Sequence, residues 1–307
     1  MAQVLQKYVG RLAPSPTGAL HLGNVRTFMV AWLRARSQGG RLVMRMEDLD
    51  HPRDKPGAAA AALADLKWMG FDWDEEFVQS ERKAVYREAL AALKAKGLVY
   101  PCTCTRRDVE AAQSAPHAGE QLHYPGTCRG RHPIYVLGAC WRFKVESPCL
   151  VEFDDAFAGH QRMDVAAKLG DFPLARDEFG AGYTLAAAVD DAGMGITEVV
   201  RGDDLIPATP PQILVQRALG LRTPVYCHLP LVVGHDGRRL AKRHGDSRIA
   251  YYRGQGIAPE AILGYLAWRS GLIPENAPLT LASLLPHFDL AKIPAVPCEF
   301  AGAELAK

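Results

Sequence analysis

A polar stretch near the start of the chain carries residue types that could bind a nucleotide. Residues 11–24 read RLAPSPTGALHLGN, a tight turn that leads into a helix with His21 and Gly23 in its first turn. Unpaired N–H groups at a helix N-terminus suit phosphate oxygens. His21 could donate a hydrogen bond to a phosphate whose charge grows during displacement, and Gly23 lacks a Cβ that would block a base or ribose. By themselves, His21 and Gly23 fit a solvated helix cap better.

A second polar stretch lies far downstream, directly after an apolar strand. Residues 235–245 read HDGRRLAKRHG, and between Asp236 and Arg253 six Arg or Lys residues face two Asp residues. Such a loop could close over a triphosphate and neutralise its developing charge. On charge alone, a solvated basic turn is an equally good interpretation.

Several nucleotide and catalytic motifs do not occur in the sequence. It has no G-x-x-x-x-G-K-[ST], G-x-G-x-x-G, H-E-x-x-H or G-x-S-x-G pattern, which argues against a P-loop ATPase, a Rossmann dehydrogenase, a zincin and an α/β-hydrolase. The 36 Lys and Arg residues nearly balance 34 Asp and Glu residues, so bulk charge does not indicate a nucleic-acid binder. With no membrane-length apolar run and no export signal, we expect a cytoplasmic protein without a membrane partner.

The spacing of apolar residues predicts an open, parallel α/β sheet. Strands and helices alternate over the first hundred residues, and Ser80 is the expected N-cap of the second of two later helices. From about residue 100 to 172 the pattern changes to short alternating segments such as 141–145, which are typical of antiparallel strands. The α/β rhythm then returns, and the last fifty residues are mostly helical.

Three cysteines in the middle segment could hold a metal ion. Cys102 and Cys104 are two positions apart, so in an extended chain their thiols point to the same side. Cys128 is a natural third ligand, and a closed zinc site needs four. On chemistry alone, His123 or His132 would be the fourth ligand. The alternative is that these cysteines are merely buried or reduced thiols.

The two polar stretches resemble the HIGH and KMSKS motifs of class I aminoacyl-tRNA synthetases. More narrowly, RLAPSPTGALHLGN, RMEDLD, YTLAAAVDD and ITEVVRGDDL resemble the glutamyl-tRNA synthetase branch. The resemblance implies a Rossmann-like catalytic domain that makes glutamyl-adenylate from L-glutamate and ATP with Mg²⁺. It also implies a division into a catalytic half at 1–99, a zinc-bearing insertion at 100–182, a second catalytic half with the KMSKS-like loop at 183–246, and a short helical portion at 247–307.

The same resemblance assigns site residues. Paired carboxylates on glutamate call for arginine, and an ammonium calls for an acid such as Glu47. An internal ion pair is the alternative for Glu47 and Arg201. His21 and Lys242 are the expected contacts to the transition state. The expected glutamate site is Arg11, Leu12, Ala13, Pro14, Ser15, Glu47, Tyr183 and Arg201, and the expected ATP site is His21, Gly23, Asn24 and Lys242.

Three positions depart from the pattern of the family. Arg239 stands where a lysine is usual and Ala241 where a serine is usual in the KMSKS-like loop. Ala187 stands where full-length glutamyl-tRNA synthetases commonly have asparagine. We therefore expect a related but not identical pocket, and Lys242 remains the best candidate in the loop.

Only about sixty residues follow Gly245, so we expect no anticodon-binding domain. With the Cys-x-Cys segment, this length resembles the glutamyl-queuosine tRNA(Asp) synthetase family. The resemblance implies transfer of glutamate to queuosine at the wobble position of tRNA(Asp) by a monomer, and one structural Zn²⁺ on Cys102, Cys104, Tyr124 and Cys128. Alternatives are a shortened charger of tRNA(Glu), a nucleotidyltransferase of the same superfamily, and a non-catalytic RNA-binding paralogue.

Overall fold

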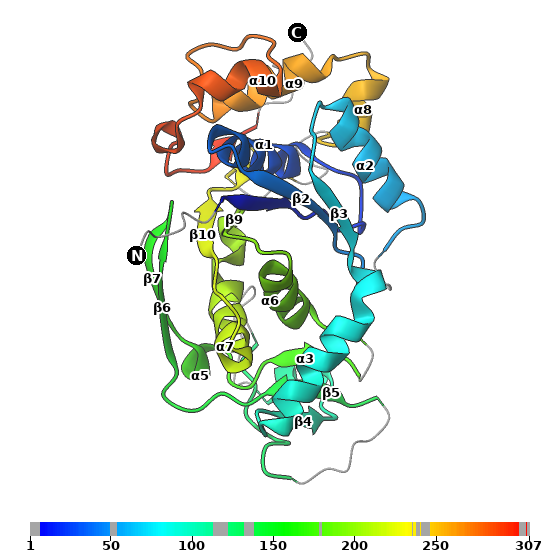
Figure 1. Cartoon of the computed structure of the whole chain (residues 1–307), viewed down its shortest axis with the longest axis vertical. Helices are drawn as coiled ribbons and strands as arrows, with labels where there is room; N and C mark the ends of the chain where they lie inside the picture. Colours follow the sequence, from blue (N-terminus) through cyan, green and yellow to red (C-terminus); the bar gives the residue numbers. More distant parts are fainter. Residues whose placement is uncertain are drawn as a thin grey trace.

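Short apolar runs form the parallel strands at the centre of the molecule (Figure 1). The computed structural model of the chain describes residues 7–49, 54–112, 122–131, 138–177, 180–234, 236–237, 240, 246–300 and 305. One sheet has the strand order β1-β2-β3 and is parallel throughout, and another has the order β7-β6-β10-β9, in which β6 and β7 pair antiparallel. The strands are β1 (Val9–Leu12), β2 (Arg41–Met46), β3 (Glu75–Val78), β6 (Leu150–Asp155), β7 (Gly159–Asp164), β9 (Glu198–Gly202) and β10 (Val225–Leu229).

The two sheets meet where β1 lies beside β9. The Thr197 amide donates to the Val9 carbonyl at 2.9 Å, and the Val9 amide donates to the Thr197 hydroxyl at 2.9 Å. The strand sequence across this junction runs β3-β2-β1-β9-β10, so the direction of winding reverses between β1 and β9. In doubly wound sheets, ligands bind at the carboxyl ends of the strands that flank such a reversal. The predicted α/β fold is confirmed, and it places the ends of β1 and β9 at the expected ligand position.

Helices cover both faces of the central strands, which explains why these strands are apolar on both sides. On β2, Leu42 and Met44 belong to one hydrophobic core and Val43 to the other. Helix α1 packs against β1, β9 and α9, while α3, α6 and α7 pack against one another below the sheet (Figure 1). These helices are α1 (Leu22–Ser37), α2 (Ala58–Trp68), α3 (Lys83–Ala95), α6 (Tyr183–Gly193) and α7 (Thr209–Leu219).

The start of α3 differs from the sequence-based expectation. Ser80 was predicted to cap this helix, but α3 begins at Lys83 after a 3-10 turn, η1 (Gln79–Arg82). The Ser80 amide and hydroxyl both donate to Asp48, at 2.8 and 2.6 Å. The prediction was wrong because a tertiary acceptor takes the hydroxyl that could otherwise have capped the helix.

A small antiparallel sheet, β4-β5-β8, lies at the lower end of the molecule in Figure 1. The antiparallel strand expected near Trp141 is confirmed as β5. The expected limits of the insertion, residues 100 and 182, remain a prediction. Strands β6 and β7 lie between these limits but belong to the same sheet as β9 and β10. The elements here are β4 (Val99–Cys102), α4 (Arg106–Ala111), β5 (Cys140–Phe143), α5 (Val165–Lys168) and β8 (Pro173–Ala175).

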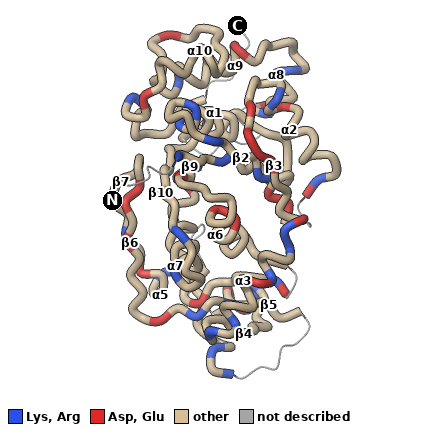
Figure 2. Tube along the Cα trace, viewed as in Figure 1, with Lys and Arg blue, Asp and Glu red and all other residues tan. Residues whose placement is uncertain are grey.

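The C-terminal residues form short helices beside α1, at the upper end of Figure 1. Strand β11, which precedes the basic loop, pairs in parallel with β12 near the C-terminus. Acidic and basic residues are both scattered over the trace in Figure 2, and neither sign is confined to one part. None of the helices in the described ranges is long and apolar enough to cross a membrane. The remaining elements are η2 (Asp203–Ala208), β11 (Val232–Val233), α8 (Ile249–Gly254), α9 (Pro259–Arg269), α10 (Leu281–Leu284), η4 (Leu285–His287), η5 (Leu290–Lys292) and β12 (Cys298–Glu299).

Candidate active site and metal cluster

Two buried arginines lie near the carboxyl ends of adjacent strands, Arg11 on β1 and Arg201 on β9. Arg11 Nη1 donates a hydrogen bond to the Val200 carbonyl at 2.9 Å, and Arg11 Nε lies 3.8 Å from Asp191 Oδ1. Burial lowers the pKa of the Arg11 guanidinium, and the Asp191 carboxylate opposes that shift. The structure therefore brings both predicted glutamate-binding arginines to the point where the sheet reverses its winding.

The Arg201 side chain is 4% exposed and is held by uncharged groups. Its Nε donates to His228 Nε2 at 3.0 Å, its Nη1 to the Tyr183 hydroxyl at 3.1 Å and its Nη2 to the Thr209 hydroxyl at 2.7 Å. These partners satisfy much of the hydrogen-bonding capacity of the guanidinium without neutralising it. A buried cation held in this way is suited to receive a carboxylate.

Glu47 takes part in an internal ion pair, although its partner is not Arg201. Arg45 Nη2 and Nε donate to the same oxygen, Glu47 Oε1, at 2.9 and 3.3 Å. Arg45 Nη1 also donates to Asp191 Oδ1 at 2.7 Å. Glu47 follows β2 and is partly exposed, so its carboxylate has a second oxygen that the Arg45 bonds do not use. It can therefore be structural and still accept an ammonium group.

The segment after β1 alternates between buried and accessible residues. Leu12 is fully buried and Pro14 is buried, whereas Ala13 is half-buried and Ser15 is exposed. The Glu47 amide donates to the Pro14 carbonyl at 2.9 Å, which holds this segment against the end of β2. Because their side chains are buried, Leu12 and Pro14 could contact a ligand only through the backbone.

His21 is the N-cap of α1. Its Nδ1 accepts a hydrogen bond from the Asn24 amide at 3.4 Å, and its own amide donates to Asn24 Oδ1 at 3.2 Å. A Cβ on Gly23 would lie 3.0 Å from His21 Cε1, so glycine leaves room for the imidazole as well as for a ligand. The structure thus contains the helix cap that is the alternative interpretation of His21 and Gly23. The same hydrogen bonds hold the imidazole ring at the N-terminus of α1.

The segments that flank the basic loop lie beside the His21 segment. Lys242, Arg239 and Ala241 lie outside the described residues, but the segments on either side of the loop are described. The Leu22 amide donates to the Ser247 carbonyl at 2.9 Å, and the Ile249 amide donates to the Leu20 carbonyl at 2.9 Å. On the other side, a Cβ on Gly23 would lie 3.7 Å from Val232 Cβ. Both ends of the loop therefore lie beside the His21 segment.

The cysteine cluster brings four donor atoms together at the other end of the molecule. The Sγ atoms of Cys102, Cys104 and Cys128 lie within 4.8 Å of one another, and those of Cys104 and Cys128 are 3.6 Å apart. Tyr124 Oη lies 3.3 Å from Cys102 Sγ and 3.7 Å from Cys104 Sγ. Around a tetrahedral ion with bonds of about 2.3 Å to sulfur and about 2.0 Å to oxygen, donor separations are about 3.5–3.8 Å. The separations of 3.3, 3.6 and 3.7 Å between these donors lie close to the values for such an ion.

Neighbouring groups favour the phenol over a histidine at this cluster. The Cys128 amide donates to Tyr124 Oη at 2.8 Å, whereas His123 Nε2 lies 3.1 Å from the Ala166 carbonyl. His132, the other alternative, lies outside the described residues. Burial raises the pKa of the Tyr124 phenol, so a cation would be needed to hold it as phenolate.

Arg142 and Cys140 were not identified from the sequence, and both lie against the cluster. Arg142 Nε donates to Cys102 Sγ at 3.2 Å, and its guanidinium lies 3.8 Å from the Tyr124 ring centre. Cys140 is opposite Cys102 in the β4–β5 register. The Cys140 hydrogen bond, followed by those from Tyr124 and Arg142, lowers the pKa of Cys102 to about 4, which favours the thiolate that a metal binds.

Five residues around the arginines were also missed. Arg45 and Asp191 lie within the quoted RMEDLD and YTLAAAVDD segments, so a search for buried charge in those motifs could have found them. Asp155, His228 and Thr209 come from strands and a helix with no motif of their own. The adjacent Asp190 serves a separate, structural purpose, since it accepts hydrogen bonds from Gln79, Arg82 and Tyr86 at 2.7–2.8 Å.

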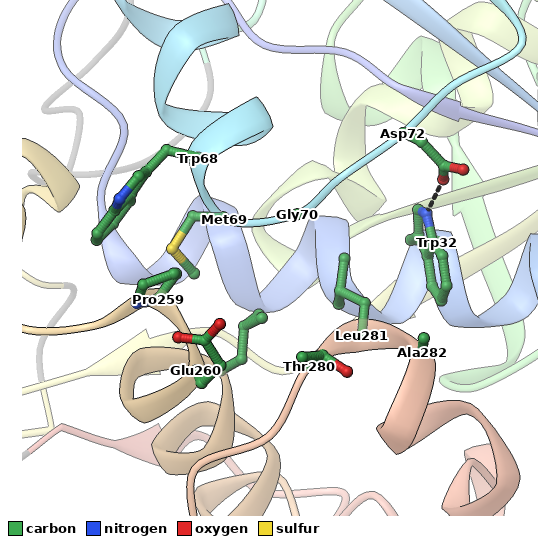
Figure 3. A pocket seen from close by; sticks show the side chains of 11 residues that line it. Trp32, Trp68, Met69, Gly70, Asp72, Pro259, Glu260, Thr280, Leu281 and Ala282 are labelled. Carbon is green, nitrogen blue, oxygen red and sulfur yellow. Dashed lines mark hydrogen bonds between the residues drawn. The ribbon is translucent and has the colours of Figure 1, made fainter.

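A cavity of about 290 Å³ lies away from these residues, between α1, α2 and the C-terminal helices (Figure 3). Its walls include Trp32 and Trp68, and its charged lining residues, Asp72 and Glu260, are both acidic. Asp72 also accepts a hydrogen bond from Trp32 Nε1 at 2.5 Å. Such a lining suits neither a triphosphate nor glutamate.

Comparison with known proteins agrees with this geometry. Residues 7–278 match the family model of the catalytic domain of class I tRNA synthetases (E and Q). The chain is 46% identical to the glutamyl-Q tRNA(Asp) synthetase of Symbiobacterium thermophilum over 97% of each chain, and 46% identical to that of Rhodopirellula baltica over 89% of this chain and 88% of the relative. It is 41% identical to glutamate–tRNA ligase 1 of Halorhodospira halophila over 94% of this chain but 64% of that one.

A solved structure has the same arrangement. The crystal structure of a glutamate tRNA ligase from Elizabethkingia meningosepticum, in complex with its amino acid, superposes with a TM-score of 0.83 at 26% identity. The match covers 98% of this chain and 68% of that one. Fold and sequence agree. The chain therefore belongs to the class I tRNA synthetases of the E and Q group, which are ATP-dependent ligases, and within that group to the glutamyl-Q tRNA(Asp) synthetase family.

Proposed function

We propose that the protein activates L-glutamate with ATP, without tRNA, to give glutamyl-adenylate. The observation that carries this proposal is the buried Arg201, whose hydrogen-bond partners are uncharged, beside Arg11 and Glu47 at the reversal point of the sheet. The arginines would bind the glutamate carboxylates, and Glu47 would bind the ammonium group. Tyr183, 40% exposed and bonded to Arg201, would stand at the entrance to this pocket.

In this reaction no side chain need act as a nucleophile. An oxygen of the glutamate α-carboxylate attacks the α-phosphorus of ATP, and pyrophosphate leaves. The protein positions the two substrates and stabilises the charge that develops on the phosphates, and Mg²⁺ accompanies the ATP. His21 at the start of α1, with Gly23 and Asn24 beside it, would contact the phosphates from one side. Lys242 would do so from the basic loop, whose two flanking segments lie beside His21.

The proposed acceptor is queuosine at the wobble position of tRNA(Asp). A hydroxyl of its cyclopentenediol attacks the carbonyl carbon of glutamyl-adenylate, an ester bond forms and AMP leaves. Support comes from the relatives named glutamyl-Q tRNA(Asp) synthetase, which this chain matches over nearly its whole length.

The proposed metal is one structural Zn²⁺ held by Cys102, Cys104, Tyr124 and Cys128. It would tie β4 to the segment that carries Tyr124 and Cys128. The separations between the four donor atoms support a tetrahedral ion.

Glutamate-dependent exchange of labelled pyrophosphate into ATP, measured without tRNA, tests the first step. Lys242→Ala should slow adenylate formation in pre-steady-state pyrophosphate release far more than it weakens glutamate binding. An unchanged chemical step in that variant would contradict the role of Lys242.

The second step is tested with labelled glutamate and tRNA(Asp) that either carries or lacks queuosine. We expect label only on the tRNA that carries queuosine, within the fragment that contains the wobble base. Label at the 3′ end would instead indicate a shortened tRNA charger. Absence of exchange and transfer in a folded protein would favour a non-catalytic RNA-binding protein.

A further inference from the structure

Behind Arg201 lies a fully buried acid–imidazole pair, Asp155 and His228. The three residues come from three adjacent strands: Asp155 from β6, His228 from β10 and Arg201 from β9. His228 is directly opposite Arg201 in the β9–β10 register, and Tyr226 on β10 is opposite Asp155. Asp155, His228 and Arg201 therefore form a row across the sheet, and the row ends at the expected glutamate pocket.

The hydrogen bonds in this row fix the state of the imidazole. An arginine Nε–H can only donate, so His228 Nε2, which lies 3.0 Å from Arg201 Nε, must accept. The proton of the neutral ring is then on Nδ1 and is donated to Asp155 Oδ2 at 2.6 Å. Asp155 Oδ1 also accepts from the amides of His228, Phe157 and Ala158, at 2.7–3.0 Å. Burial lowers the pKa of His228, in keeping with a neutral ring.

The ring is also held by packing. Tyr226 stacks beside His228 with ring centres 6.0 Å apart, and the Arg201 guanidinium lies 5.2 Å from the Tyr226 ring centre. The Thr209 hydroxyl contacts both Arg201 Nη2, at 2.7 Å, and His228 Nε2, at 3.3 Å. Arg201 thus has little freedom to turn.

We propose that Asp155 and His228 are positioning residues that orient Arg201 and supply its negative counter-charge through the imidazole. The terminal nitrogens of Arg201 then bond to the Tyr183 and Thr209 hydroxyls and to no protein carboxylate among the described residues, so a substrate carboxylate can approach them. A carboxylate in direct contact would form a paired, charge-assisted bond with the guanidinium and would compete with the substrate. The interposed imidazole avoids that competition while keeping a buried negative charge near a buried positive one. This inference rests on the proposed glutamate activation.

The test compares variants of the full-length protein in glutamate-dependent ATP–pyrophosphate exchange. His228→Leu removes both ring hydrogen bonds, whereas His228→Gln keeps one acceptor for Arg201 and one donor for Asp155. We expect His228→Leu to raise the KM for glutamate about tenfold or more, because a misplaced binding group has effects of this size. The KM for ATP should change less than about twofold, and His228→Gln should recover most of the loss.

Two further variants complete the design. His160→Leu, the same change at an exposed histidine on β7, should leave both KM values unchanged. Asp155→Asn keeps the shape but removes the charge and permits the wrong imidazole tautomer, so it should also raise the KM for glutamate. Thermal unfolding identifies any variant that does not fold.

Each outcome has a distinct meaning. Failure of the wild type to catalyse glutamate-dependent exchange would refute the proposed function and this inference with it. An active wild type, with a folded His228→Leu variant that keeps the wild-type KM for glutamate, would overturn the positioning role alone. A uniform loss of affinity for glutamate and ATP, with no recovery in His228→Gln, would also overturn it. If His228→Leu does not fold, an unchanged KM for glutamate in Asp155→Asn decides against the proposal.

Discussion

The proposed glutamate pocket and the cysteine cluster each contain a buried arginine, but the two arginines would act on ligands of opposite charge. In the pocket, Arg201 is bonded to a ring nitrogen and two hydroxyls, so a positive charge is held ready for an anion. In the cluster, Arg142 donates to the Cys102 thiol and lies over the Tyr124 ring, where it can balance the negative charge of donors that would hold a cation.

The two sites also differ in how they depend on their ligands. Each cation of the pocket has protein partners of its own, so we expect the pocket to keep its shape without glutamate. The cluster packs three thiols and a phenol within a few ångströms, and their ionised forms would repel one another without a metal. We therefore expect the proposed glutamate pocket to be preformed and the proposed metal to contribute to folding.

The largest effect should come from removing the cation of the pocket. Arg201→Leu should lower kcat/KM for glutamate about thousandfold, because loss of a buried, hydrogen-bonded charge costs about 4 kcal/mol. The measurement is glutamate-dependent ATP–pyrophosphate exchange, and Arg222→Leu, at an exposed arginine, is the matched control. Near-wild-type activity in Arg201→Leu would show that Arg201 does not bind the substrate.

Removing one donor of the cluster should have the next largest effect. Cys104→Ser should weaken zinc binding about a hundredfold, since four ligands share an apparent binding free energy of about 10–16 kcal/mol. Elemental analysis of protein purified without chelator, and thermal unfolding, should both register the loss. Cys149→Ser changes a half-buried cysteine outside the cluster and should retain zinc. A wild-type protein with no stoichiometric zinc would rule out the metal site.

A smaller effect is expected from the arginine beside the cluster. Arg142→Gln should weaken zinc binding about tenfold, the usual range for a group that contacts metal ligands without binding the metal. Competition with a chromophoric chelator gives the affinity. Arg106→Gln, at an exposed arginine on α4, serves as control. Equal affinity in Arg142→Gln and wild type would show that the cluster needs no counter-charge.

The smallest expected effect is a pH dependence of the free energy of unfolding that is due to His228. Burial lowers the pKa of His228 below its ordinary value of 6.5, so the unfolded chain takes up a proton as pH falls below this value while the folded chain does not. The free energy of unfolding should therefore decrease as pH falls from 7 to 5.5, by at most about 1.4 kcal/mol per pH unit for this one group. Asp155, whose pKa is also lowered, contributes only at more acidic pH.

Urea denaturation of wild type and His228→Gln at pH 7 and 5.5 isolates the contribution of His228 to the pH dependence of stability. The glutamine variant should lose less stability on acidification, because it has no imidazole to protonate in the unfolded chain. Identical losses in the two proteins would mean that His228 does not stay neutral in the folded state.

Most of the fold could be predicted because periodicity and turn residues report local structure. Residues 8–12 and 42–46 contain short apolar runs that are typical of buried strands, and they overlap β1 and β2. Ser80 shows the limit of such reasoning. Its type fits a helix cap, but Asp48, from a distant part of the sequence, binds the hydroxyl instead.

The candidate site divides in the same way. Arg11 and Arg201 stand out from the sequence because a charged residue in an apolar strand needs a reason, and Cys102 and Cys104 stand out through their spacing. His228 and Asp155 carry no such signal, since each looks like an ordinary polar residue at a strand end. Only the pairing of β6, β10 and β9 reveals that they support Arg201.

The sequence by itself determined which residues could carry the proposed chemistry: arginines for carboxylates, a helix start and a basic loop for phosphates, and thiols for a metal. Residue type and spacing are sufficient for that because they fix charge, donor atoms and local backbone geometry. Tertiary structure alone decided which of these groups meet and which partners hold them. Strand order and register are set by packing over the whole chain, so no local stretch encodes that Asp155, His228 and Arg201 form one row.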